Sequence, residues 1–138
     1  MEQVGSGYVL LCEDDLNDVF LFKHEWRRAG FNTPVRVMAD GEEVLNLLKR
    51  CVDKNDKCPI LIISDHRLIA GGGMDILEFV HGSPMFNCIP ILLTSGVIDP
   101  DARSKALEMG AVDYLEKPLT AEVMQELVAR LPLATPLR

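Results

Sequence analysis

Four short runs of mainly apolar residues in this sequence each end on side chains that can bind a cation or a phosphoryl group. The runs and the polar residues that follow are Tyr8–Cys12 with Glu13, Asp14 and Asp15; Pro59–Ser64 with Asp65; Pro90–Leu93 with Thr94 and Ser95; and Asp113–Glu116 with Lys117. In an open parallel α/β sheet, ligand-binding residues gather at the carboxyl ends of the strands. Carboxylates, a hydroxyl and an ammonium group at one edge therefore predict a site for a divalent cation and a phosphoryl group.

The acidic residues of this predicted site need a counter-charge. If the first and third strands are neighbours, Glu13, Asp14 and Asp65 converge. Two like charges ~4 Å apart repel by roughly 4 kcal/mol at an effective dielectric constant near 20. A hard divalent cation with oxygen ligands would answer that need, and Lys117 would add a further positive charge. The alternative is that Glu13, Asp14 and Asp15 only cap the following helix, where acids favour the helix dipole.

Apolar runs of strand length alternate with segments of helical periodicity, which is typical of β/α units. The expected strands are Tyr8–Cys12, Pro34–Met38, Pro59–Ser64, Ile91–Ser95 and Val112–Glu116. The expected helices are Leu16–Ala29, one capped by Asp40 with Val44, Leu45, Leu48 and Cys51 on its buried face, Asp75–Val80, one after Asp99-Pro100 that ends at Gly110, and Ala121–Leu131 with Val123, Leu127 and Leu131 on one face. Val52–Lys57 is expected to be a loop. These five units predict one domain over residues 1–138, with its core at about 8–131 and short tails.

The bulk composition excludes several classes of protein. With 138 residues, 48% apolar and 25% charged, the chain resembles an ordinary soluble domain with a full core. A net charge of −7 argues against a nucleic-acid partner, which needs a basic surface. Neither a membrane span of ~20 apolar residues nor a signal peptide is present, so we expect a cytoplasmic protein with no membrane partner. The cysteines, at positions 12, 51, 58 and 88, form no C-x-x-C pair and are expected to be reduced core residues.

The predicted site residues resemble those of a known family. Glu13-Asp14, Asp65, Ser95-Gly96 and Lys117-Pro118 occur in the order and at the spacings of response regulator receiver domains, the CheY-like modules of two-component signalling. The stretches Val9–Asp15 and Gly110–Thr120 are especially similar. This resemblance implies a flavodoxin-like (βα)5 fold, with five parallel strands in the order 2-1-3-4-5.

The resemblance also implies a role for each site residue. Asp65 would be the phosphoacceptor, and Mg²⁺ or Mn²⁺ would be held by Glu13, Asp14, Asp65 and the backbone carbonyl of Arg67. Ser95 and Lys117 would bind the phosphoryl oxygens, and the Lys117–Pro118 peptide bond would be cis. Ser95 would then move inward, and Tyr114 would switch into the space it leaves. Tyr114 could instead be only a half-buried aromatic of its strand.

The segment that follows Asp65 departs from the family pattern. Ile69 stands where the family usually has proline, and Ala70-Gly71-Gly72-Gly73 is longer and richer in glycine than usual. The glycines are not a phosphate-binding P-loop, which needs a Lys-Ser or Lys-Thr pair after them. We therefore interpret them as a flexible loop. His66 is interpreted as a loop side chain rather than a catalytic base, and His24 and His81 as surface residues.

These residues predict a stand-alone receiver rather than an enzyme. It would accept a phosphoryl group from a sensor histidine kinase or a histidine phosphotransfer protein. It would act through a downstream protein or a homodimer, using a surface at about Ala102–Leu127. Asn17-Asp18-Val19 and Asp40–Glu43 resemble regulators that pair with phytochrome-type kinases.

Three alternatives remain open at this point. A receiver-fold interaction module that does not switch would leave Asp65 unused. A phosphatase of the haloacid dehalogenase type needs a second acid two residues after the nucleophile, where this chain has Arg67. A flavin binder would need a glycine- and hydroxyl-rich loop after the first strand, where acids stand instead.

Overall fold

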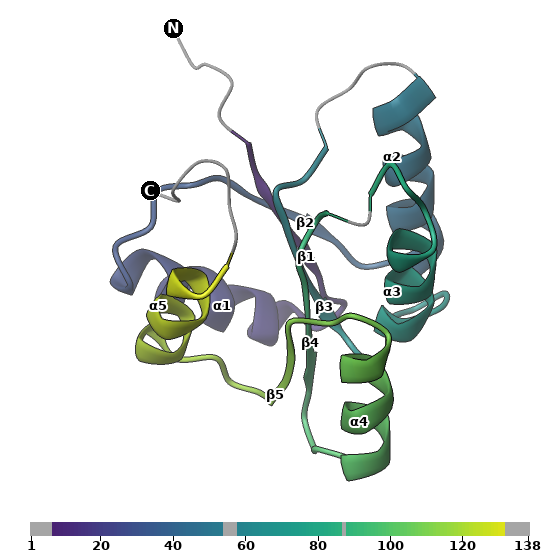
Figure 1. The fold of residues 1–138 in the computed structure, drawn as a ribbon. Coiled ribbons are helices and arrows are strands. Elements are labelled where there is room, and N and C mark those ends of the chain that lie inside the picture. Colours follow the sequence, from purple (N-terminus) through teal and green to yellow (C-terminus); the bar gives the residue numbers. More distant parts are fainter. Residues whose placement is uncertain (1–6, 54–57, 87, 132–138) are drawn as a thin grey trace, which may run out of the picture.

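Five parallel strands form a single sheet at the centre of the molecule. The computed structural model describes residues 7–53, 58–86 and 88–131. The strands are β1 (Val9–Cys12), β2 (Val35–Met38), β3 (Leu61–Asp65), β4 (Ile91–Ser95) and β5 (Asp113–Glu116), in the order β2-β1-β3-β4-β5 (Figure 1). The predicted strand order is therefore confirmed.

Four helices connect successive strands, and a fifth follows β5. They are α1 (Leu16–Arg28), α2 (Gly41–Asp53), α3 (Gly73–His81), α4 (Pro100–Glu108) and α5 (Ala121–Ala129). α2 continues through Asp53, so the predicted loop at Val52–Lys57 is wrong at its start, and residues 54–57 lie outside the described part. α3 begins two residues before the expected Asp75, because Asp75 accepts a hydrogen bond from the Gly72 N–H and closes the first turn from within the helix.

The two faces of the sheet bury separate cores, because successive side chains of a strand point to opposite faces. Leu10 and Cys12 of β1 pack on the side covered by α2, α3 and α4. Val9 and Leu11 pack on the side covered by α1 and α5 (Figure 1). β1 and most of β3 are buried on both faces, as expected of central strands in a parallel sheet.

α1 and α5 are joined by packing and by several polar contacts, among them those of the half-buried Glu25 carboxylate and the ion pair between Arg28 and Glu122 at 3.0 Å. Trp26 of α1 is 2% exposed, and its indole N–H donates to the Thr33 carbonyl at 3.0 Å. Glu25 accepts hydrogen bonds from Arg28 at 2.8 Å and from the Ala121 N–H at 2.9 Å. The Arg28 guanidinium and that N–H lower the pKa of Glu25 to about 2.

One residue of the predicted α5 face does not point inward. Val123 is 38% exposed, whereas Met124 is 1% and Leu127 is 2% exposed. Thr120 caps the helix through the Val123 N–H, and the inward stripe then runs through Ala121, Met124 and Leu127. The prediction for Val123 was wrong because a three- and four-residue spacing admits two adjacent stripes.

The cysteines differ in burial more than expected. Cys12 and Cys51 are buried, Cys58 is half-buried and Cys88 is exposed, and all four are free. The interpretation as core residues therefore holds for two of them and fails for Cys88. Among the described residues, no helix has the length and apolar character needed to cross a bilayer.

The glycine-rich segment between β3 and α3 is closely packed against neighbouring backbone. A Cβ atom on Gly72 would lie 2.4 Å from the His66 carbonyl oxygen, and one on Gly41 of α2 would lie 2.3 Å from that of Ala70. Backbone hydrogen bonds from Leu68 to Gly71 and from Gly73 to His66 close the turn at 3.2 and 3.1 Å. These glycines therefore serve close approach, and the prediction of a flexible loop missed that use.

We expect Gly72→Ala to destabilise the fold by about 1–3 kcal/mol, because the new methyl group must displace backbone. Gly96→Ala is the matched control, since a Cβ there meets no atom within 4 Å. Urea unfolding of both variants measures the difference. Equal midpoints for the two variants would contradict the close packing of the loop.

The low pKa of Glu25 predicts a pH effect on stability. A carboxylate with a lowered folded-state pKa stabilises the fold above its unfolded pKa of 4.5, and this contribution disappears as pH falls toward about 2. Between these two pH values, the free energy of unfolding of Glu25→Gln should therefore fall less steeply with decreasing pH than that of the wild type. Acid titrations followed by circular dichroism test this, with Glu126→Gln as the control. A wild-type slope in Glu25→Gln would remove the α1–α5 contact from the acid response.

Candidate functional site

The register of the sheet brings four strand ends to one edge. Cys12 pairs with Ser64, so Glu13 and Asp65 follow at neighbouring positions. Ser95 at the end of β4 pairs with Glu116 at the end of β5, so Lys117, the next residue, lies beside the end of β4. The backbone N–H of Lys117 donates to the Ser95 carbonyl at 2.8 Å. The predicted convergence of β1, β3, β4 and β5 at this edge follows from parallel pairing.

Three carboxylates form an oxygen-lined cluster at this edge. Glu13, Asp14 and Asp65 each offer an oxygen within 4.8 Å of the others. Glu13 is 4% exposed and Asp65 is half-buried, whereas Asp14 is exposed. Asp15 is the residue that caps α1, accepting hydrogen bonds from the N–H groups of Asn17 and Asp18. Within the acidic run, Asp15 therefore caps α1, whereas Glu13 and Asp14 contribute to the carboxylate cluster.

Lys117 lies among carboxylates from three elements. Its Nζ donates to Glu13 Oε1 at 3.0 Å, to Asp65 Oδ2 at 3.1 Å and to Asp18 Oδ2 at 2.6 Å. An ammonium group has three donors, so these contacts use all of them. The peptide bond from Lys117 to Pro118 is cis, as the family resemblance implies.

The electrostatics of the cluster follow from burial opposed by pairing. Burial raises the pKa of Glu13, and the hydrogen bonds from Lys117 and the Asp15 N–H only partly offset it. For Lys117, burial lowers the pKa, but hydrogen bonds to Asp18, Glu13 and Asp65 outweigh it, so the pKa lies above its ordinary value. Lys117 therefore stays charged throughout the physiological pH range and supplies the counter-charge.

The hydroxyl predicted at the end of β4 is present but faces its own loop. Ser95 Oγ donates to the Val97 carbonyl at 2.8 Å. Thr94, one residue earlier, is buried, and its hydroxyl donates to the Ser64 carbonyl at 3.4 Å. Ser95, by contrast, is partly exposed, so its hydroxyl is the one at this edge that can turn toward a ligand without disturbing the core.

Tyr114 is already buried in this structure. Its side chain is 2% exposed, and its ring packs edge-on against the His66 ring with centroids 5.8 Å apart. Tyr114 is therefore more deeply buried than the half-buried strand aromatic that the alternative interpretation expected. His66 is half-buried, and its Nδ1 has no hydrogen-bond partner among the described residues. His66 thus contacts the predicted switch residue and does not only occupy a loop.

Two further groups complete the surroundings of the site. Arg67 is exposed and forms an isolated antiparallel bridge with Gly72. Among the described residues, no backbone N–H donates to the Arg67 carbonyl. Its predicted role as a metal ligand stays a prediction. On β5, Asp113 accepts a hydrogen bond from Arg103 of α4 at 3.2 Å and lies 3.6 Å from Arg130, which follows α5. Asp113 therefore ties both flanking helices to the strand.

The donor set fits a hard divalent cation. All three clustered ligands are carboxylate oxygens, which suit Mg²⁺ and Mn²⁺ and give no preference for softer metals. The buried Glu13 carboxylate would also gain a strong counter-charge from such an ion.

Comparison with known proteins identifies the family. The family model described as "Response regulator receiver domain" matches residues 9–129. The chain belongs to this family. It is a receiver domain of two-component signalling, and the sheet order and helices are those of the flavodoxin-like receiver fold.

Curated relatives of this receiver domain include proteins of different lengths. The probable methanogenesis regulatory protein FilR2 of Methanothrix harundinacea is 27% identical over 93% of this chain and 83% of its own length. The chemotaxis protein CheV3 of Helicobacter pylori is 32% identical over 91% of this chain, which spans 41% of CheV3. The receiver thus occurs both as most of a protein and as less than half of one.

Solved structures share the receiver fold over nearly the whole chain. The bacteriophytochrome response regulator AtBRR has a TM-score of 0.82 at 21% identity, covering 98% of this chain and 99% of that chain. The Mn(2+)-bound form of response regulator Rcp1 has a TM-score of 0.78 at 20% identity, covering 94% and 98%. At these identities the comparison establishes the fold.

Asp18 is the residue of the site that the sequence analysis did not identify as a partner of Lys117. It lies in the first turn of α1, three residues after the capping Asp15, and 99 positions from Lys117. The only sequence signal for this contact was that Asp18 lies in the acidic first turn of a helix that begins at the site. The contact of His66 with Tyr114 has no sequence signal at all.

We expect Lys117→Met to raise the affinity for Mn²⁺ by at least about tenfold, because the ammonium group competes with the ion for Glu13 and Asp65. Isothermal titration calorimetry measures this. Lys105→Met on the exposed side of α4 changes the net charge equally and is the control. Equal affinity in both variants would show that Lys117 does not compete with the ion.

Proposed function

We propose that this protein is a stand-alone response regulator that accepts a phosphoryl group on Asp65 in a Mg²⁺-dependent reaction. The observation that carries the proposal is the position of Asp65, which is half-buried, lies beside two carboxylates and accepts a hydrogen bond from Lys117 at 3.1 Å. Such an arrangement can hold a cation and a transferred phosphoryl group together. Receiver domains work with histidine kinases and phosphotransfer proteins, which makes a phosphohistidine the donor in this proposal.

In the proposed reaction, a carboxylate oxygen of Asp65 attacks the phosphorus of the phosphohistidine. A P–O bond forms as the P–N bond breaks, and the electron pair of that bond returns to the imidazole, which takes up a proton. Glu13, Asp14, Asp65 and the Arg67 carbonyl would hold the metal, which when bound neutralises charge on the phosphoryl oxygens. Lys117 would stabilise the same oxygens, since its ammonium already lies against Asp65.

The phosphoryl group would then change the hydrogen bonds of Ser95. It adds strong acceptor oxygens and about −1.5 to −2 of charge in a phosphate ester. Ser95 would exchange the Val97 carbonyl for a phosphoryl oxygen. Because Tyr114 already lies inside the fold against His66, phosphorylation would hold the ring there rather than bring it in. The surface altered by phosphorylation, which a partner would recognise, would be formed by α4, β5 and α5, within Ala102–Leu127.

The partners complete the proposal. The donor would be a sensor histidine kinase or a histidine phosphotransfer protein, and the output would be a downstream protein or a homodimer. The chain spans 99% of AtBRR, a bacteriophytochrome response regulator, which supports one receiver over residues 1–138 and a phytochrome-type kinase as donor.

A second candidate function is an interaction module of the same fold that does not switch. The buried Tyr114 ring favours it, since the residue expected to move already occupies its inner position. The two functions differ in whether phosphorylation of Asp65 changes the environment of Tyr114 and Ser95.

We expect incubation with acetyl phosphate and Mg²⁺ to add one phosphoryl group, and Asp65→Asn to abolish this gain because the amide is a poor nucleophile. Intact-mass and peptide mass spectrometry measure the gain and its position. Asp101→Asn, an exposed aspartate of α4, is the control and should be labelled like the wild type. Labelling that persists in Asp65→Asn would refute Asp65 as the acceptor, and a folded wild type with no gain would favour the module that does not switch.

A further inference from the structure

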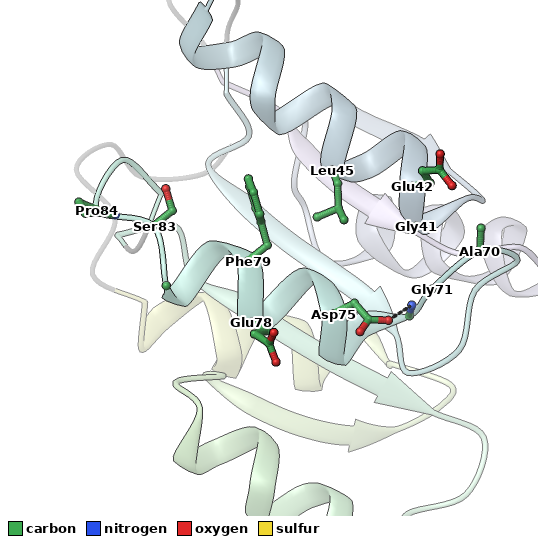
Figure 2. Close-up of a pocket in the computed structure, with 12 residues that line it drawn as sticks. Gly41, Glu42, Leu45, Ala70, Gly71, Asp75, Glu78, Phe79, Ser83 and Pro84 are labelled. Atoms are coloured by element: carbon green, nitrogen blue, oxygen red, sulfur yellow. Dashed lines mark hydrogen bonds between the residues drawn. The ribbon is translucent and has the colours of Figure 1, made fainter.

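A groove of about 800 Å³ lies between α2 and α3, and the receiver chemistry does not use it. Figure 2 shows the groove running from Ser83 and Pro84 at one end to Ala70 and Gly71 at the other. Its volume is in the range of clefts that bind small ligands and short segments. It is large enough for a few residues of a partner and too small for a whole domain face.

Two half-buried apolar side chains line the space between the helices. Leu45 of α2 and Phe79 of α3 pack on the core below and are not fully covered (Figure 2). The Nζ of Lys49 lies 6.0 Å from the centroid of the Phe79 ring. One face of that ring therefore already lies against a cation of this chain, and the anchor of a ligand would pack on the remaining exposed part.

Among the described residues that line the groove, the charged ones are all acidic. They are Glu42 from the first turn of α2 and Asp75 and Glu78 from α3. None of these carboxylates forms an ion pair with another residue of the described chain. Asp75 gives one oxygen to the Gly72 N–H and keeps the other free. Three carboxylates without an ion-pair partner among the described residues, around an apolar floor, favour a ligand that is basic and carries an apolar anchor.

Close backbone packing at the Ala70–Gly71 end holds the two walls of the groove together. Gly41 lies so close to the Ala70 carbonyl that a Cβ atom would be 2.3 Å from its oxygen. This contact joins the first turn of α2 to the segment before α3, so the two walls are fixed relative to each other. A groove with fixed walls binds without a large ordering cost.

We propose that this groove is a docking site for a basic segment of a partner protein, with one aliphatic or aromatic anchor between Lys or Arg residues. The anchor would pack on Leu45 and Phe79, and the basic side chains would pair with Glu42 and Glu78. Charge complementarity of this kind sets partner choice and speeds association. A second copy of this chain is the poorer occupant, because a protein of net charge −7 is repelled by an acidic groove.

The proposal does not depend on phosphorylation of Asp65, so its test is separate from that of the proposed function. The probe is a random-peptide phage library, selected on the immobilised protein of residues 1–138. We expect enriched peptides to combine Lys or Arg with one apolar anchor. Their binding should shift the NMR amide signals of Gly41, Gly71 and Gly82, which line the groove.

Two double variants separate the groove from the overall charge of the protein. Glu42→Gln with Glu78→Gln should weaken the selected peptides roughly five- to tenfold, as expected for the loss of two ion pairs. Glu43→Gln with Glu108→Gln removes the same charge from exposed positions outside the groove and should leave binding unchanged within about twofold.

Several results would overturn the proposal. They are peptides enriched without basic residues, equal weakening in both double variants, or amide shifts confined to α4, β5 and α5. Light scattering provides a further test, because a dimer that dissociates only in Glu42→Gln with Glu78→Gln would assign this face to a second copy of the chain.

Discussion

The arrangement of the site depends on one ammonium group held among carboxylates from three different elements. Lys117, just after β5, reaches Glu13 after β1, Asp65 at the end of β3 and Asp18 in α1. Without it, the carboxylates that the parallel register brings together would repel each other inside a partly buried edge. The ion pairs therefore allow the strands to pack in register although the pairing concentrates carboxylates, the donor set that suits a divalent cation, at one edge.

His66 connects this edge to the rest of the fold. Its N–H donates to the Thr94 carbonyl at 2.7 Å, its carbonyl accepts from Gly73, and its ring lies against Tyr114. The residue directly after the proposed acceptor thus has contacts on β4, on α3 and on β5. A displacement of Asp65 has a short physical path both to the α4–β5–α5 surface and to the loop that ends the groove between α2 and α3.

The sequence predicted the strands and the polar residues at their ends because both depend on local signals, whereas the strand order was implied by the resemblance to receiver domains. Apolar runs marked the strands, and polar residues at their ends marked a common edge once the strands were taken as parallel. What it could not predict depends on contacts between distant segments. Asp18 was not distinguishable from any acid in a first helical turn until α1 was placed beside Lys117.

The glycines after β3 show the same limit in another form. Glycine serves both mobility and close approach, and only the neighbouring atoms decide between them. The Ala70 and His66 carbonyl oxygens, facing Gly41 and Gly72, decide for close approach. Val123 was misplaced for a related reason, since two adjacent stripes of α5 are apolar and only packing on the sheet selects one.

Asp113 gives the surface of α4, β5 and α5 a property that the site does not share. The arginines that it binds, Arg103 and Arg130, are 46% and 50% exposed, so dissolved ions reach these pairs freely. At physiological ionic strength charges are screened over ~8 Å, and exposed pairs weaken further as salt rises. Lys117 is only 18% exposed and is much less affected. Ionic strength therefore acts unequally on the two regions: it loosens the ion pairs of the α4–β5–α5 surface under conditions that leave the ion pairs of Lys117 intact.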